Sequence, residues 1–315
     1  MSDPFENPFR AVTTFLTPQQ LLSTTTSRIV GNSLSIFGSV FNLITIFHVR
    51  TSTAILRKMI VSLCVMDLIF NILSMFSILS TENELLCSSL GFLVLYGYNG
   101  SIVLTCCFAH CLNSTLKRSE AEANTGKLWK IYQILGFVSP IILSGIATGT
   151  QYYRVQDNYC WHYPSDEAQI DWQDFFLSFL PTTIAVLYCM YCYLSVIRKL
   201  REMGMRVYLE LLFYPLILII CSFPWNAYSL YSIFSTQPPP FDLFVIANVM
   251  LSMQGFFNAL AYGLSRTIIS GYKRLFCERR KRQQSSLTPE PKMILAPSEI
   301  RSSLLGDLAF SAVSK

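Results

Sequence analysis

Asp67 is the residue whose position in this sequence most requires a chemical explanation, because it lies inside a long apolar segment. A charged carboxylate at the centre of a bilayer costs about 2.5–3.5 kcal/mol on insertion scales, so it needs polar partners. On a helix, Asp67, Asn71 and Ser74 share one face. A single acid is a thin basis for a proton relay, whereas it can organise a network of hydrogen bonds between helices.

Two other apolar segments carry polar side chains that can partner Asp67, one near the start of the chain and one after residue 240. These side chains are Asn32, Ser35, Ser39 and Asn42 in the first segment, and Asn248, Ser252 and Asn258 in the later one. The resulting polar seam either holds the helices together, at about 0.6 kcal/mol per contact, or acts as a switch whose hydrogen bonds rearrange. An intramembrane acid favours the switch. Its candidate residues are Asn42, Asp67, Asn71, Asn258 and Tyr262.

The histidines and lysines that could support catalysis, metal binding or a bound cofactor are not placed where they could act together. His48 and His110 fall near the inner ends of their apolar segments, whereas His162 lies in a loop expected on the outer side, so the three histidines cannot share a metal ion. The cores of the apolar segments hold no lysine that could form a retinal Schiff base. We therefore expect neither an enzyme nor a bound metal or cofactor.

Composition places the chain in a membrane. Hydrophobic residues make up 52% and charged residues 14% of the 315 residues, whereas soluble domains carry about 25% charged residues. This composition excludes a soluble or nucleic-acid-binding protein. Seven apolar runs cover residues 29–48, 59–80, 86–109, 131–153, 173–197, 208–235 and 241–265. Because these runs are too long and continuous for barrel strands, the predicted fold is all-α, a seven-transmembrane-helix bundle over residues 29–265.

Lysine and arginine predict the orientation of this bundle. With residues 1–28 placed outside as a short extracellular N-terminus, the outer segments hold three of the 24 basic residues and the inner segments hold 21. The positive-inside rule therefore puts the N-terminus outside and the C-terminus inside, as an odd number of spans requires. We expect a multi-pass protein of the plasma membrane.

A different composition begins after the seventh run. Residues 266–282 have apolar side chains at helical spacing and end in a basic cluster. This pattern predicts an amphipathic helix on the inner leaflet, attracted to anionic lipid. Cys277 near its end is either palmitoylated or a free thiol. Residues 283–315 are rich in Ser and Pro and are predicted to form a disordered cytoplasmic tail.

Three further features concern the geometry of the bundle. Cys87 and Cys160 are the two cysteines on the outer side, where an oxidising compartment favours a disulfide over two free thiols. Pro224 removes a backbone donor and predicts a hinge in the sixth helix, and Gly255 permits a bend in the seventh. Proline is also simply tolerated in membrane helices, as Pro140 and Pro181 indicate.

Seven spans, an outer N-terminus, the outer cysteine pair and the amphipathic helix together resemble a G-protein-coupled receptor over about residues 29–280. The third helix ends in Ala109-His110-Cys111-Leu112-Asn113, without the acidic-Arg pair of the rhodopsin-like class. Cys160-Trp161 and Gln254-Gly255-Phe256-Phe257-Asn258 are similar to the secretin, adhesion and cyclic-AMP receptor group, and Tyr214-Pro215-Leu216-Ile217 is similar to the cyclic-AMP receptors. Because 28 residues are too few for a hormone-binding domain, the resemblance is to the cyclic-AMP-receptor-like members.

The resemblance implies a receptor that passes an extracellular ligand signal to a heterotrimeric G protein by a conformational switch of the bundle. The G protein would contact the basic residues Lys117, Arg118, Arg198, Lys199 and Arg201. Aromatic residues in the outer half could line a ligand pocket, although interfacial aromatics are common in membrane proteins. They are Tyr96, Trp161, Trp225 and Tyr228.

Two alternatives stay open. Cyclic AMP carries a phosphate that needs Arg or Lys, but the outer segments hold ten acids against three arginines, so the ligand is not carried over. A small seven-helix transporter or channel is the alternative function. The receptor is favoured because the first and last three helices show no convincing internal repeat, which transporters often have.

Overall fold

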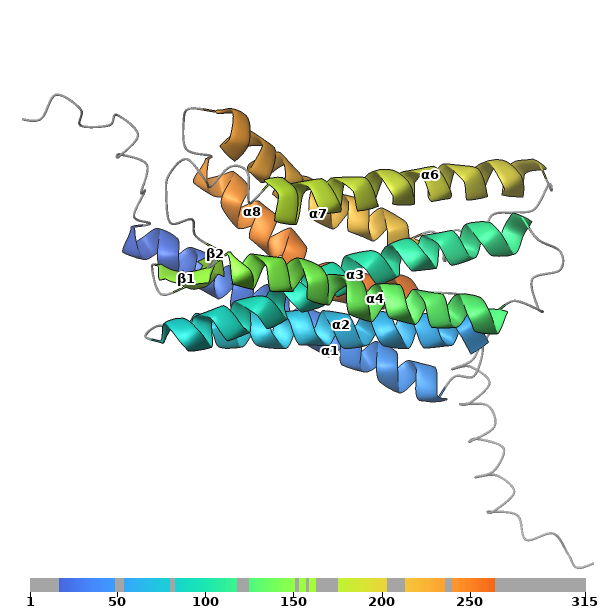
Figure 1. Ribbon diagram of the computed structural model, residues 1–315, viewed down its shortest axis with the longest axis horizontal. Helices are drawn as coiled ribbons and strands as arrows, with labels where there is room; N and C mark the ends of the chain where they lie inside the picture. Colours follow the sequence, from blue (N-terminus) through green and yellow to red (C-terminus); the bar gives the residue numbers. More distant parts are fainter. Residues whose placement is uncertain are drawn as a thin grey trace, which may run out of the picture. The chain divides into compact units, whose positions relative to one another are not determined.

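Helices form nearly all of the described part of the computed structural model, which also contains a short hairpin between α4 and η3 (Figure 1). The structure describes residues 17–48, 54–79, 83–117, 125–150, 153–156, 159–162, 175–202, 213–235 and 240–263. The elements are α1 (Pro18–His48), α2 (Ala54–Leu79), α3 (Glu84–Lys117), α4 (Thr125–Gly149), β1 (Tyr153–Gln156), β2 (Tyr159–His162), η3 (Phe175–Phe179), α6 (Leu180–Glu202), α7 (Phe213–Phe234), α8 (Phe241–Ser252) and α9 (Gln254–Gly263). The element η3 is one π-helical turn that leads directly into α6.

Several of these helices are long and apolar enough to cross a membrane, as in a multi-pass membrane protein. Five described segments qualify alone: Leu22–His48, Arg57–Ser77, Leu85–Thr115, Lys127–Gly149 and Phe175–Glu202. The pair α8 and α9 adds a sixth if the 44° bend between them lies within one span. In α7 the apolar segment Leu216–Ser232 is shorter than 18 residues. The count of seven spans therefore stays a prediction.

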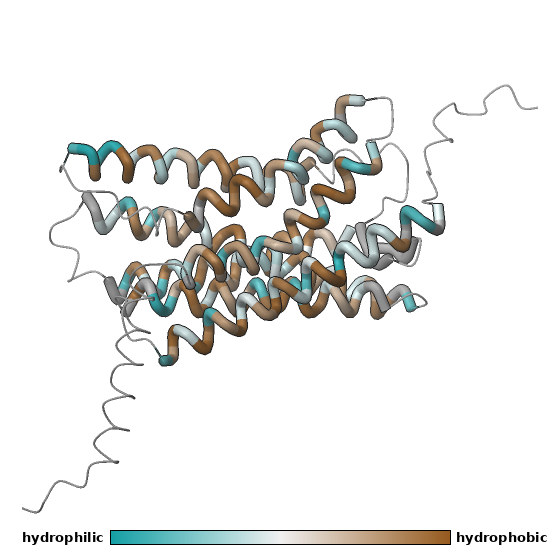
Figure 2. Tube along the Cα trace, turned by 180° about the vertical axis from the view of Figure 1, so that it is seen from behind, coloured by the Kyte–Doolittle hydropathy of each residue, from teal (hydrophilic) through white to brown (hydrophobic). Residues whose placement is uncertain are grey.

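Side chains are distributed as they are in a protein surrounded by lipid. Large apolar side chains such as Phe37, Phe47 and Phe223 are exposed, whereas many Asn, Ser and Thr side chains are buried between the helices. Figure 2 shows hydrophobic residues along the middle of the helices and hydrophilic residues at ends such as that of α6. A soluble protein has the opposite arrangement, because polar side chains are favoured at a surface in contact with water and large apolar side chains are favoured in the interior.

The helix α3 lies at the centre of the helix contacts, and it packs against α2, α4, α6 and α7. Its approach to α2 depends on two glycines. A Cβ atom at Gly97 would lie 2.7 Å from the backbone nitrogen of Phe70, and one at Gly100 would lie 2.8 Å from the sulfur of Met66. The absence of these side chains lets α3 bring Ser101 against α2.

The helix α1 packs against α2, α8 and α9. Small residues again permit the close approach, since a Cβ atom at Gly38 would lie 2.9 Å from the Cβ of Ala259. The helix α2 therefore contacts α1 and α3, and it also contacts α9, the helix that follows Met253.

Several predicted boundaries are wrong. The helix α1 begins at Pro18 rather than at residue 29, and α3 continues to Lys117 rather than ending near 109. Both helices extend through polar residues that a hydropathy pattern does not count. The fourth run was expected to reach residue 153, but α4 ends at Gly149 and Tyr153 begins a four-residue strand of a hairpin. The predicted helix at 266–282 and the tail at 283–315 lie outside the described residues.

We predict that Gly97→Ala lowers the free energy of unfolding by about 1–3 kcal/mol, because the new methyl group would overlap the backbone of α2. Gly145→Ala is the matched control, since a Cβ atom there meets no heavy atom within 4 Å. Thermal unfolding of both variants in the same detergent measures the difference. Equal melting temperatures would show that the α2–α3 contact does not depend on the missing side chain.

Candidate functional site at Asp67

The carboxylate of Asp67 joins three helices. Asp67 lies on α2 and is only 3% exposed. Its Oδ1 accepts a hydrogen bond from Ser101 Oγ on α3 at 2.6 Å, and its Oδ2 accepts one from Asn258 Nδ2 on α9 at 3.1 Å. Each oxygen of this one acid therefore holds a different neighbouring helix.

Gln254 extends this network toward the start of α9. Its Nε2 donates a hydrogen bond to Ser101 Oγ at 3.3 Å. A serine hydroxyl has one hydrogen to donate and can also accept, so Ser101 links Gln254 to Asp67. The network therefore contacts α9 at both Gln254 and Asn258, which are one helical turn apart.

The break between α8 and α9 has a specific cause in the side chain of Ser35. In an unbroken helix the N–H of Phe256 would donate to the carbonyl of Ser252, four residues earlier. Instead, the hydroxyl of Ser35 on α1 donates to that carbonyl and accepts from that N–H, the latter at 3.1 Å. A side chain inserted into the backbone ladder is a known cause of sharp bends, so Ser35 accounts for the 44° angle between α8 and α9.

The predicted bend at Gly255 is therefore displaced to Met253, the residue between the two helices. The absence of a side chain at Gly255 permits the close contact between α9 and α1. A Cβ atom on it would lie 3.1 Å from Ser39 Oγ and 3.2 Å from Ser35 Cβ. Without that atom, α1 comes near enough for Ser35 to reach the broken ladder.

In the part of the chain that the structure describes, neither Asn42 nor Asn71 hydrogen-bonds the carboxylate of Asp67. Asn71 donates through Nδ2 to the backbone carbonyl of Asp67 at 2.6 Å, within its own helix. Asn42 is buried on α1. Tyr262 is buried. Among the described residues, the amide oxygens of Asn42 and Asn71 have no hydrogen-bond partner.

Ser101 and Gln254 are the two members of the network that sequence reasoning left out. The predicted seam joined only the first, second and seventh helices, whereas Ser101 belongs to α3. The signal that could have found it is the pair of glycines at 97 and 100, since glycine marks a close approach between membrane helices.

Arg28 occupies a second polar cluster, on α1. Its Nη2 donates to Ser74 Oγ at 3.0 Å, and Asn32 Nδ2 donates to the same oxygen at 3.2 Å. Ser74 lies on α2, two turns from Asp67. Burial of Arg28 in this cluster means that its charge faces the bundle.

Two of the four predicted pocket aromatics lie together. Trp225 and Tyr228 on α7 stack with ring centroids 5.7 Å apart, and Tyr228 also contacts Phe244 on α8 at 5.4 Å. The indole nitrogen of Trp225 donates to Ser178 Oγ in the π-helical turn η3 at 3.0 Å. This cluster follows Pro224, which lies inside α7. Tyr96 is partly buried on α3, and the side chain of Trp161 lies outside the described residues.

Cys87 is fully buried near the start of α3, and its sulfur is disulfide-bonded. Cys160 lies in β2, and this strand packs against α3. The side chain of Cys160 is not among those described, so its pairing with Cys87 stays a prediction.

The predicted basic surface lies at the ends of α3 and α6. Lys117 is the last residue of α3, and Arg198, Lys199 and Arg201 lie in the last turns of α6. Lys199 Nζ forms an ion pair with Glu202 Oε2 at 3.2 Å. Arg118 and Cys277 lie outside the described residues.

The part of the chain that the structure describes holds no group of three His, Cys, Asp or Glu side chains able to bind a metal ion. Comparison with known proteins adds no identification, because neither a protein-family model nor a curated protein matches this chain. The arrangement around Asp67 must therefore be interpreted from its own chemistry, which is that of a hydrogen-bond hub beside a broken helix.

We predict that Ser35→Ala lowers the free energy of unfolding by about 1–3 kcal/mol, because the variant removes the partner of two buried backbone groups. Amide exchange at Phe256 should also accelerate, since its N–H loses its acceptor. Ser139→Ala is the control, because that hydroxyl donates to the Leu135 carbonyl of its own helix. Unchanged exchange at Phe256 would contradict the role given to Ser35.

Proposed function

We propose that this protein is a seven-helix receptor of the G-protein-coupled type, similar to the cyclic-AMP-receptor-like group. An extracellular ligand would shift the bundle between two states, and the change would reach a heterotrimeric G protein on the inner side. The observation that carries the proposal is the position of Asp67, whose two oxygens hold α3 and α9 beside the break at Met253.

A hub of this kind supports two discrete states rather than gradual motion. If α9 or α3 moves, Asp67 loses a donor, and a buried carboxylate without donors is costly. The displaced donor then needs another acceptor. Asn71 lies one turn from Asp67, and its amide oxygen has no partner among the described residues, so it can accept such a donor. Rearrangement of hydrogen bonds between two packings is an established form of molecular switch.

The direction of the signal rests on the distribution of charge. By the positive-inside rule, the ends of α3 and α6 that carry basic residues lie in the cytoplasm. The basic residues at the end of α6 are Arg198, Lys199 and Arg201. The N-terminus is then extracellular, in the plasma membrane. On the same side, a Cys87–Cys160 disulfide would hold the β1–β2 hairpin against α3, near the mouth of a ligand pocket.

A transporter or channel is the second candidate, and the feature that suggests it is the bent pair α8 and α9. Transporters bind ions and substrates at broken helices, through backbone groups freed by the break. Here Ser35 already bonds the Ser252 carbonyl and the Phe256 N–H. These groups are therefore occupied by the protein, which favours the receptor.

The deciding experiment co-expresses the protein with G-protein subunits and measures nucleotide exchange in membranes. We predict that Asp67→Asn changes basal exchange at least about fivefold, the lower end of typical allosteric coupling, while surface expression is retained. Ile72→Val, on the exposed face of the same helix, should change neither.

Two outcomes oppose the proposal in different ways. Unchanged exchange in Asp67→Asn would make Asp67 a structural link between helices. Substrate flux into liposomes, together with no nucleotide exchange by the wild-type protein, would make the protein a transporter.

A further inference from the structure

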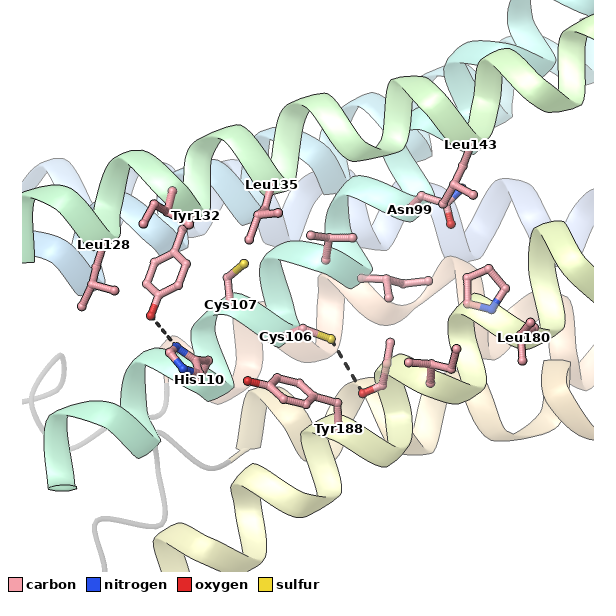
Figure 3. A pocket seen from close by; sticks show the side chains of 16 residues that line it. Asn99, Cys106, Cys107, His110, Leu128, Tyr132, Leu135, Leu143, Leu180 and Tyr188 are labelled. Carbon is pink, nitrogen blue, oxygen red and sulfur yellow. Dashed lines mark hydrogen bonds between the residues drawn. The ribbon is translucent and has the colours of Figure 1, made fainter.

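A cavity of about 680 Å³ opens between α3, α4 and α6 (Figure 3), and its lining does not include the residues of the Asp67 network. Its volume lies in the range of pockets that bind small molecules. Most of its lining is apolar, and no lysine, arginine or carboxylate is part of it. A phosphate-bearing or other charged ligand therefore has no counter-charge here.

The cavity opens toward the surroundings of the bundle. Four of its apolar or aromatic lining residues are strongly exposed: Ile131 and Leu135 on α4, and Ile184 and Tyr188 on α6. In a bilayer these side chains face lipid. A ligand would enter laterally from the membrane, and its body must be lipophilic.

The two ends of the cavity carry different polar groups. Asn99 lies at one end with Leu143, and His110 and Tyr132 lie at the other. Along α3, His110 lies eleven positions after Asn99, which corresponds to a rise of about 16.5 Å. An elongated molecule fits this length.

The polar groups at the far end satisfy each other, because His110 Nδ1 and the hydroxyl of Tyr132 are 2.6 Å apart and share a hydrogen bond. Asn99 differs. Its side chain is only 2% exposed, and its Nδ2 has no hydrogen-bond partner among the described residues. A buried donor without an acceptor is unfavourable, and an oxygen supplied from the cavity would remove that cost.

We propose that this cavity binds an elongated lipophilic molecule from the membrane that carries one hydrogen-bond acceptor oxygen. The oxygen accepts from Asn99 Nδ2, and the apolar body lies along α3 toward Tyr132. The ligand would bridge α3, α4 and α6, where Cys106 on α3 already donates to the carbonyl of Ala185 on α6 at 3.7 Å. This site depends on the helices lying in lipid, but it does not depend on the receptor function.

The test uses a photoreactive, alkyne-tagged 3-ketosteroid and the purified protein in lipid nanodiscs. Labelling of α3, α4 or α6 peptides should be displaced by excess untagged 3-ketosteroid and not by the steroid hydrocarbon that lacks the oxygen. Asn99→Leu, which keeps the volume but removes the donor, should reduce displaceable labelling at least about tenfold. Ile184→Trp should block it by filling the cavity.

Ile142→Trp is the matched control, because Ile142 is exposed on α4 and does not line the cavity. It should label like the wild type. The proposal is overturned if Asn99→Leu labels normally, or if Ile142→Trp loses as much labelling as Ile184→Trp. Should Asn99→Leu fail to fold, the comparison of Ile184→Trp with Ile142→Trp and the competition by the hydrocarbon still decide the result.

Discussion

A carboxylate enclosed by helices constrains this structure more than any other group. Apolar packing alone discriminates weakly between helix arrangements in a bilayer, because lipid chains are as apolar as the side chains. Asp67 discriminates strongly, since its two oxygens need donors and find them on α3 and α9. The arrangement of these three helices is therefore tied to one acid. Glycines on α3 permit the approach that places Ser101 within reach.

The same constraint extends to the break near the end of the described region. Gln254 and Asn258 bind the Asp67 network from one side, and Ser35 binds Ser252 and Phe256 from the other. The start of α9 is thus held by α1, α2 and α3 together. Ser35 bonds the residues on both sides of the bend, so the angle between α8 and α9 depends on these two hydrogen bonds, which gives the proposed switch a defined location.

Sequence reasoning could predict the parts of this structure that follow from hydropathy and residue type. The helical, multi-pass character and the need of Asp67 for partners follow from the apolar runs and from the cost of a buried charge. The helix boundaries were less accessible, because α1 continues through polar residues that carry no hydropathy signal. The partner on α3 was signalled only by the glycines at 97 and 100, and the bend at Met253 could not be predicted, since it depends on a side chain from another helix. Gly255 looked like a hinge, but its effect is to admit α1.

The most direct test of the central claim exchanges the two side chains that join α2 to α9. Asp67→Asn and Asn258→Asp each disturb the pair. The first removes the charge of the acceptor, and the second places two carboxylates against each other. In the double variant the pair is restored in reverse, and Ser101 still finds an oxygen at position 67. The account predicts that the double variant recovers most of the unfolding free energy lost in either single variant, as measured by thermal unfolding in detergent. Additive losses in the double variant would show that the two side chains do not interact and would contradict the account.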